Sequence, residues 1–246
     1  MSEVTWHVHD QLAQMADGDL ALRLNLVRPQ DGMHGIRWHG QGCLGLVPMQ
    51  SWADTSRQEE DEVLVEQFVR DGDLIVKYAQ RPTGTAYRQV IWRSISELEY
   101  GGVEWVASVQ TSLLASQPAL HCQTVSPTGS GWWSWNADDP QHWHEHVPGA
   151  KVSSLSADQA PVFLCRLADV PCSYVEMVFP ADYQGAELFV GEDGGRLRYT
   201  LFQEFLEKGV IRRGRVRAIW VPRDGDLQYA EAAFRSFVAS PIPLGT

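Results

Sequence analysis

The residues best suited to chemistry lie near the middle of the chain, where aromatic rings are concentrated. Four tryptophans occur close together there, at Trp132, Trp133, Trp135 and Trp143. Exposed indole rings offer flat faces to sugar rings, and clustered tryptophans also mark protein interfaces. The other interpretation is that these rings fill a core or roof a cavity between two sheets. The stretch therefore predicts either an aromatic ligand-binding surface or a buried cluster.

Three histidines alternate around the last of these tryptophans, at His142, His144 and His146. In an extended segment this spacing puts the three imidazoles on one face, as a ligand set for a divalent metal requires. Glu145 points to the opposite face and does not complete the set. The alternatives are a weak metal site and a solvated histidine-rich loop.

Arg213, Arg215 and Arg217 form a second group with chemical potential. In a strand they share one face and give a basic stripe in an acidic protein. Guanidinium groups suit carboxylate, sulfate or phosphate. The structural alternative is a strand whose arginines pair with acidic side chains of neighbouring strands. The sequence thus predicts either part of a ligand site or a set of ion pairs.

The common signatures of nucleotide and hydrolase chemistry do not occur in the sequence. There is no nucleophile elbow, phosphate-binding loop, dinucleotide fingerprint or His-Glu-x-x-His helix. Cys43, Cys122, Cys165 and Cys172 are scattered without a Cys-x-x-Cys pair, which indicates reduced thiols. We therefore predict no cofactor.

Charge and composition exclude some partners. A formal net charge of -11 over 246 residues argues against binding to nucleic acid or to an anionic membrane surface. The N-terminus lacks the pattern of a secretory signal, and no stretch is long and apolar enough to span a bilayer. We expect a cytoplasmic protein.

The elements that would position these residues are strands, because the dominant hydrophobic period is two. Residues 103–113 alternate clearly: Val103, Trp105 and Val109 fall on a core face, and Ser108 and Gln110 on a face toward water or a polar cleft. Asp71-Gly72 separates two β-rich segments and predicts a hairpin. Further strands are expected at residues 20–27, 35–39, 63–69, 74–78, 87–93, 119–125, 162–167, 173–179, 187–190, 196–202 and 210–221.

Two helices are expected. A short one is predicted at residues 203–208, ended by Gly209, and a longer amphipathic one after Asp226, which we interpret as its N-cap. Pro241 and Pro243 end the second helix. Residues 127–158 are irregular and predict either a binding loop or further strands. The fold class is mostly β: a large two-sheet, supersandwich-like β-sandwich with a C-terminal amphipathic helix. Residues 1–246 are interpreted as one unit, with a division within 127–158 as the alternative.

Three stretches together resemble an uncharacterised planctomycete-type bacterial family. They are residues 69–78 with Ile91-Trp92-Arg93, the strand ending at Leu114, and residues 205–213 leading into Val221-Pro222-Arg223. The resemblance covers most of the chain and implies no activity. The many-stranded layout also resembles the galactose-mutarotase supersandwich, whose enzymes use a histidine acid and a glutamate base around an open sugar cleft. No motif residue of that fold matches here, so no catalytic residue is assigned.

The functional prediction is a carbohydrate-recognising protein. Its cleft would be lined by the four tryptophans and by Arg213, Arg215 and Arg217. Two alternatives stay open: a carbohydrate-active enzyme of epimerase or lyase type, and a protein-interaction module anchored by the tryptophans.

Overall fold

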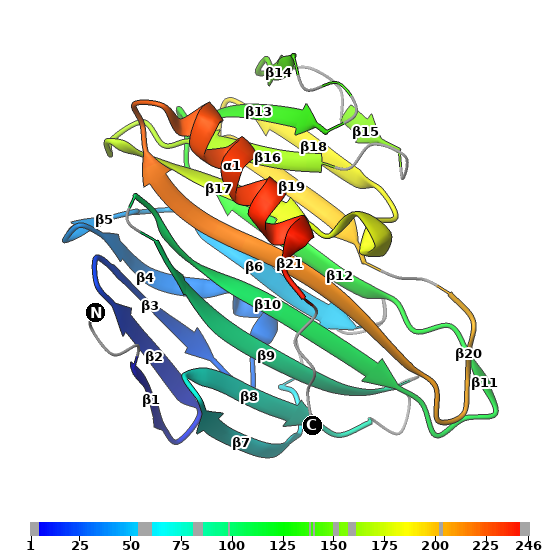
Figure 1. Cartoon of the computed structure of the whole chain (residues 1–246). Coiled ribbons are helices and arrows are strands. Elements are labelled where there is room, and N and C mark those ends of the chain that lie inside the picture. Colours follow the sequence, from blue (N-terminus) through cyan, green and yellow to red (C-terminus); the bar gives the residue numbers. More distant parts are fainter. Residues whose placement is uncertain are drawn as a thin grey trace.

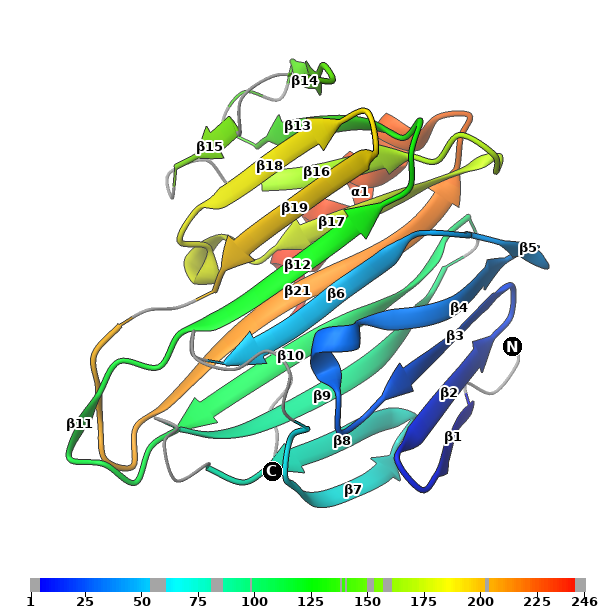
Figure 2. The same ribbon diagram turned by 180° about the vertical axis from the view of Figure 1, so that it is seen from behind.

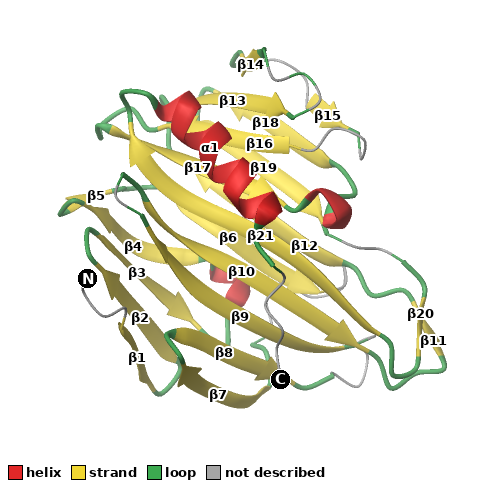
Figure 3. Ribbon diagram, viewed as in Figure 1, coloured by secondary structure: helices red, strands yellow, loops and turns green. Residues whose placement is uncertain are grey.

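Antiparallel strands make up most of the protein (Figure 3). The computed structural model describes residues 5–53, 61–80, 86–97, 99–137, 139, 141–149, 153–156, 161–201 and 204–241. The predicted mostly-β sandwich with a C-terminal helix is confirmed.

A nine-stranded sheet runs through the whole molecule (Figure 1). From one edge to the other its strands are β14 (Trp143–His146), β13 (Gly131–Asn136), β16 (Pro161–Arg166), β17 (Cys172–Val178), β21 (Ile211–Pro222), β10 (Gly101–Gln110), β9 (Tyr87–Ser96), β8 (Asp73–Tyr78) and β7 (Leu64–Arg70). The sheet joins strands from both sides of the irregular segment at 127–158, and the long strands β21 and β10 lie side by side at its centre.

Two smaller sheets stack on one face of this sheet, which we call the inner face (Figure 2). One contains β15 (Ser153–Leu155), β18 (Ala186–Gly191), β19 (Gly194–Thr200), β12 (Leu120–Ser126) and β6 (Val47–Ala53). The other contains β1 (Thr5–His9), β2 (Leu12–Asp17), β3 (Leu20–Asn25), β4 (Met33–Trp38) and β5 (Gln41–Gly42). A short ribbon of β11 (Ala115–Ser116) and β20 (Leu206–Glu207) projects at one end, and single 3₁₀ turns occupy Pro29–Asp31 and Pro180–Asp182.

The main core fills the space between the nine-stranded sheet and the two smaller sheets. Its largest side chains come from all three sheets and include Met15, Trp105, Tyr174, Tyr199 and Trp220, which are fully buried. Alternation along the strands sends these residues inward, and burying apolar area of this kind is the dominant favourable contribution to folding.

Helix α1 (Asp226–Ala239) covers part of the opposite, outer face of the nine-stranded sheet (Figure 1). Ala230, Ala233, Phe234 and Phe237 are its buried apolar residues, and they pack on the outward side chains of β16, β17 and β21. The remaining outer face over β10, β9, β8 and β7 has no helix on it in the described part of the chain.

The helix begins differently from the prediction. Gly225, in the left-handed conformation at φ 77°, occupies the N-cap position, and Asp226 is the first helical residue. The Asp226 carboxylate receives hydrogen bonds from Arg166, at 2.8 Å, and from Ser173, at 2.6 Å. Glycine fits the N-cap position because a positive φ carries no steric penalty without a Cβ atom, and the Asp226 side chain binds the sheet beneath the helix instead of capping the helix.

The prediction of a short helix at 203–208 is wrong for residues 204–208, which are the part that the structure describes. Leu206–Glu207 form β20, and Gly209 at φ 85° lies in the turn that leads to β21. The apolar residues of so short a segment do not distinguish a helical turn from a ribbon strand. Residues 127–158 contain strands β13, β14 and β15, which lie at the edges of two sheets, so of the two alternatives for this segment the further strands are found in its described part.

The hairpin prediction is confirmed. Asp71 and Gly72 both have positive φ, 51° and 82°, as a two-residue type I′ turn between β7 and β8 requires. All four cysteines are buried and free. Among the described helices, none is long and apolar enough to cross a membrane.

Candidate functional site

The arginine stripe of β21 lies on the outer face of the nine-stranded sheet, as the alternation predicts. Arg213, Arg215 and Arg217 pair across the sheet with Ser108, Val106 and Glu104 of β10. The environment changes along this stripe. Arg215 and Arg217 are buried, whereas Arg213 is only partly covered.

Glu104 holds both buried arginines. Its Oε1 accepts hydrogen bonds from Nε and Nη2 of Arg215, at 3.0 and 2.8 Å, and its Oε2 accepts from Nη2 of Arg217 at 2.7 Å. The three side chains are at most 6% exposed. One carboxylate therefore compensates two guanidinium groups in a site closed to water, where an uncompensated charge would be costly.

The C-terminal end of α1 supplies the remaining compensation. Arg215 donates to the carbonyl oxygen of Ser240 at 3.2 Å and to its hydroxyl at 2.8 Å. The guanidinium carbons of Arg215 and Arg217 lie 4.8 and 4.7 Å from the centre of the Phe237 ring. Carbonyl groups at a helix C-terminus carry partial negative charge, and an aromatic face attracts a cation. Arg215 and Arg217 thus join the helix to the sheet.

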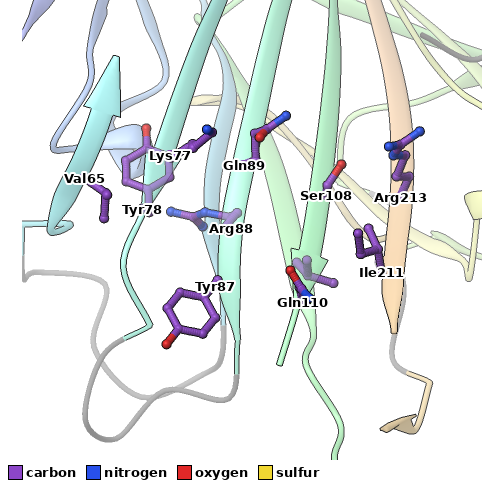
Figure 4. A pocket seen from close by; sticks show the side chains of 11 residues that line it. Val65, Lys77, Tyr78, Tyr87, Arg88, Gln89, Ser108, Gln110, Ile211 and Arg213 are labelled. Atoms are coloured by element: carbon purple, nitrogen blue, oxygen red, sulfur yellow. The ribbon is translucent and has the colours of Figure 1, made fainter. Parts of the chain in front are cut away.

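A pocket of about 460 Å³ opens on the part of the sheet that α1 leaves uncovered (Figure 4). Four polar side chains form a row across adjacent strands: Lys77 on β8, Gln89 on β9, Ser108 on β10 and Arg213 on β21. They face the same way because each is the register partner of the next. The row therefore comes from four separate segments of the chain that only sheet pairing brings together.

A second row, nearer the strand ends, adds aromatic and aliphatic surface. Tyr87 pairs with Gln110, which pairs with Ile211, and all three line the pocket. Tyr87 and Ile211 are about half exposed, 47% and 54%, so their apolar surfaces are accessible to a ligand. The described residues that line the pocket include no carboxylate and no imidazole. The arrangement can donate and accept hydrogen bonds and can pack on a ring, but it lacks an acid–base pair.

Buried interactions fix the strands around the pocket, and two of the residues involved, Tyr78 and Arg88, also line it. Arg88 forms an ion pair with Glu62, Nη2 to Oε1 2.9 Å, and its guanidinium lies 4.7 Å from the centre of the Tyr78 ring. The Tyr78 hydroxyl donates to the carbonyl oxygen of Leu26 at 2.8 Å, and burial raises the pKa of Tyr78. These contacts tie the ends of β8 and β9 to the core.

The four tryptophans do not line this pocket. Trp132 is fully buried between the sheets and donates to Ser126 at 2.9 Å. Trp135 is buried against Phe234 of α1 and stacks on the half-buried Trp143, whose indole donates to Glu231 at 3.1 Å.

Trp133, also half-buried, carries the Arg166 guanidinium 4.4 Å from its ring centre. Every one of the four rings is thus occupied by contacts within the protein. An apolar groove between α1 and β13 does run along Trp135, beside Phe234, Val238 and Ala239.

The three histidines lie at the opposite edge of the sheet, in and just before β14. His142 contacts Asp139, Nδ1 to Oδ1 3.0 Å, an interaction that lowers the pKa of the Asp139 carboxyl. His146 lies 2.8 Å from the Ser134 hydroxyl, and burial lowers its pKa, with His144 adding to the effect. In the described part of the chain no three histidine, cysteine or acidic side chains are grouped as metal ligands. The metal site stays a sequence-based prediction without support from this geometry.

Lys77, Gln89 and Tyr87 were not identified from the sequence. Ser108 and Gln110 were assigned to the polar face of a strand, and that face does line the pocket. A search for polar side chains on the exposed face of every predicted strand would have included these residues. It would not have aligned them, because strand order is not encoded locally.

No protein-family model and no curated protein matches the chain. The planctomycete-type resemblance therefore stays a prediction. Solved structures do match.

A structure from Escherichia coli K12, named for an inferred aldose 1-epimerase activity, has a TM-score of 0.58 at 8% identity, over 89% of this chain and 99% of that one. A Klebsiella pneumoniae protein with the same inferred activity has a TM-score of 0.58 at 7% identity, over 98% of this chain and 89% of that one.

The Slr1438 protein of Synechocystis sp. PCC 6803 has a TM-score of 0.55 at 9% identity, over 89% of this chain and 96% of that one. At these identities the matches show the fold alone. The predicted galactose-mutarotase-like supersandwich is confirmed at that level.

Proposed function

We propose that the protein binds a carbohydrate in the pocket on the open outer face of the nine-stranded sheet. The observation that carries the proposal is the row of Gln89 and Ser108 beside the exposed faces of Tyr87 and Ile211. Sugar hydroxyls both donate and accept hydrogen bonds, as an amide and a hydroxyl do, while the C–H faces of a sugar ring pack on aromatic and aliphatic groups. The volume, about 460 Å³, suits a small ligand.

The fold supports this proposal. Solved structures with the same fold are named for an inferred activity on aldoses. Aldose epimerisation needs an acid and a base near the anomeric centre. The described lining residues contain neither a histidine nor a carboxylate, so binding is favoured over epimerisation.

The tryptophan-anchored interaction module is the less favoured alternative. Trp132 and Trp135 are buried, and the rings of Trp133 and Trp143 already pack against Arg166 and Trp135. An interface anchor needs an exposed face to insert into a partner.

A thermal-shift screen against mono- and disaccharides tests the proposal, followed by calorimetry on each hit. A ligand present at 100 times its Kd stabilises the native state by about 2.7 kcal/mol. We expect Gln89→Ala and Ser108→Ala each to weaken binding of a hit about tenfold, the loss of one or two hydrogen bonds.

Gln123→Ala is the matched control. Gln123 is also a half-buried amide on a strand, but it lies on β12 in another sheet and bonds to Gln50 at 2.9 Å. Equal weakening by all three variants, or binding that none of them alters, would place the ligand elsewhere and refute the proposed site.

A further inference from the structure

The pocket on the outer face is elongated across the strands. Its described lining comes from five consecutive strands of the nine-stranded sheet, β7, β8, β9, β10 and β21. At about 4.8 Å for each inter-strand step, the four steps from β7 to β21 span about 19 Å. Along any one strand the described lining covers at most three consecutive residues, which is about 7 Å from the first to the last. A ligand that fills the pocket is therefore long and narrow, and a single sugar ring would occupy only part of it.

Exposed apolar side chains recur along this direction on every second strand. Val65 lies on β7, Tyr87 on β9 and Ile211 on β21, and all three are exposed. Each is two inter-strand steps from the next, which corresponds to about 10 Å. The intervening strands β8 and β10 contribute the polar side chains of Lys77 and Gln110 to the lining. The apolar contacts that the pocket offers therefore repeat with a period of two strands.

The neutral polar side chains of the pocket are available to a ligand. Three of them make no hydrogen bond within the part of the chain that the structure describes: Gln89, Ser108 and Gln110. By contrast, Lys77 forms an ion pair of 2.6 Å with Glu66. Arg88 is likewise paired with Glu62. Because amides and hydroxyls both donate and accept hydrogen bonds, as sugar hydroxyls do, this lining favours a neutral ligand that is rich in hydroxyl groups.

An extended chain of 1,4-linked pyranose rings matches both repeats of the pocket. Such a chain advances by roughly one inter-strand spacing for each ring. When its linkages are equatorial, successive rings are turned over, so the same ring face recurs at every second ring. A C–H face of a ring packs well on aromatic and aliphatic groups. The pocket places such groups on every second strand, and hydrogen-bonding side chains beside them.

We propose that the ligand is a neutral, extended oligosaccharide of 1,4-linked pyranose rings that lies across the strands from β7 to β21. Alternate rings pack on Val65, Tyr87 and Ile211 (Figure 4). Gln89 and Ser108 bind the hydroxyl groups of the chain. This inference rests on the proposed carbohydrate site, and it adds the length, the shape and the charge of the ligand. Tyr87, in the middle of the row, contacts short and long chains, whereas the outer two residues contact only the long ones.

The test uses calorimetry on the full-length protein with cellobiose, cellotriose and cellopentaose as an extended series. Maltopentaose provides five rings of the same sugar in a curved chain. Affinities are measured for the wild type and for Tyr87→Ala, Ile211→Ala and Gln89→Ala. Two matched controls remove exposed apolar side chains outside the described lining. Phe189→Ala lies on β18 in another sheet, and Val69→Ala lies on β7.

We expect affinity to rise at least tenfold from cellobiose to cellopentaose, and cellopentaose to bind at least tenfold more tightly than maltopentaose. Tyr87→Ala and Gln89→Ala should each weaken the whole extended series about tenfold. Ile211→Ala should weaken cellopentaose and leave cellobiose within about twofold, because two rings on Tyr87 do not reach β21. Both controls should leave every affinity within about twofold. Raising NaCl should also change binding less than twofold, because salt screens only charged contacts.

The outcomes that overturn the inference separate it from the proposed function. If cellobiose or maltopentaose binds as tightly as cellopentaose and Gln89→Ala weakens all of them, the carbohydrate site stands and the extended ligand is refuted. The same holds if none of these sugars binds while the wider saccharide screen yields a ligand that Gln89→Ala weakens. If cellopentaose binds equally to the wild type and to all three pocket variants, it binds elsewhere and both proposals fail. Both also fail if no saccharide of either set binds to the folded protein.

Discussion

Strand β21 passes through two regions of the same sheet face, and its arginines differ between them. In the covered region, Arg215 and Arg217 share the carboxylate of Glu104 beneath Phe237 and Ser240 of α1. In the open region, Arg213 stands in a row with Ser108 at the edge of a pocket. The spacing and the residue type are identical, so the coverage by α1 decides which arginines of the stripe are buried and which one is only partly covered.

The comparison shows why one basic stripe cannot be assigned one role. Where water is excluded, a guanidinium must be compensated by a carboxylate or a helix C-terminus, because an isolated buried charge is very unfavourable. Where solvent reaches the sheet, an ion pair contributes little to stability.

The largest expected effect comes from breaking the covered cluster. Among the described residues, Glu104 provides the carboxylate that pairs with the guanidinium groups of both Arg215 and Arg217, and Glu104→Gln leaves these two buried cations without it. We expect the free energy of unfolding to fall by about 3–5 kcal/mol. Urea titration measures it, with Glu66→Gln in the open region as the matched control. A loss no larger than that of Glu66→Gln would show that the cluster is not compensated as described.

Removing the Phe237 ring that covers the same cluster should destabilise the fold almost as much as Glu104→Gln does. Phe237 is fully buried and packs on both arginines and, at 5.7 Å between ring centres, on Phe179. Phe237→Ala should lower the free energy of unfolding by about 3 kcal/mol, because a large apolar side chain is lost and a cavity remains. Chemical denaturation provides the measurement. Val238→Ala, at an exposed position of the same helix, should change stability far less.

A pH-dependent effect is expected from a buried carboxyl on the inner face of the same sheet. Glu176 is fully buried and receives hydrogen bonds from Thr124 and Tyr174, both at 2.5 Å, and from Tyr199. Burial raises the pKa of Glu176, although the three hydroxyl groups oppose the shift. Unlike Glu104, it has no guanidinium partner among the described interactions.

The folded protein therefore binds the Glu176 proton more tightly than the unfolded chain does. The stabilisation from this proton is complete below the unfolded pKa, about 4.3, and is lost as the pH rises through the higher folded value. Glu176→Gln cannot titrate, so its stability relative to the wild type should improve as the pH rises from about 4 to 8. Urea midpoints across that range measure the difference. Parallel pH profiles for the two proteins would contradict the raised pKa.

The smallest effect is expected in the open region. Lys77 and Glu66 form an ion pair of 2.6 Å, but their side chains are 41% and 49% exposed. Lys77→Ala should change the free energy of unfolding by less than about 1 kcal/mol, because water screens the pair. Thermal or urea unfolding tests this directly. A loss above about 2 kcal/mol would mean that this exposed ion pair contributes far more to stability than exposed pairs usually do.

The sequence by itself determined the local features of this protein. The alternation of residues 103–113 places Val103, Trp105 and Val109 in the core, and their burial agrees. The Asp71-Gly72 turn and the amphipathic C-terminal helix also follow from local chemistry, since positive φ and a helical apolar stripe are encoded within a few residues.

Tertiary structure decided what those features are for. No local sequence pattern encodes the pairing of β21 with β10 and β17. Nor does any local pattern encode the position of α1, which covers Arg215 and Arg217 and not Arg213. The tryptophan-rich segment was irregular by sequence because its strand buries residues on both faces, Trp132 against one core and Trp135 against the other. Strand order and helix placement depend on contacts between distant segments, and the pocket row of Lys77, Gln89, Ser108 and Arg213 exists only through them.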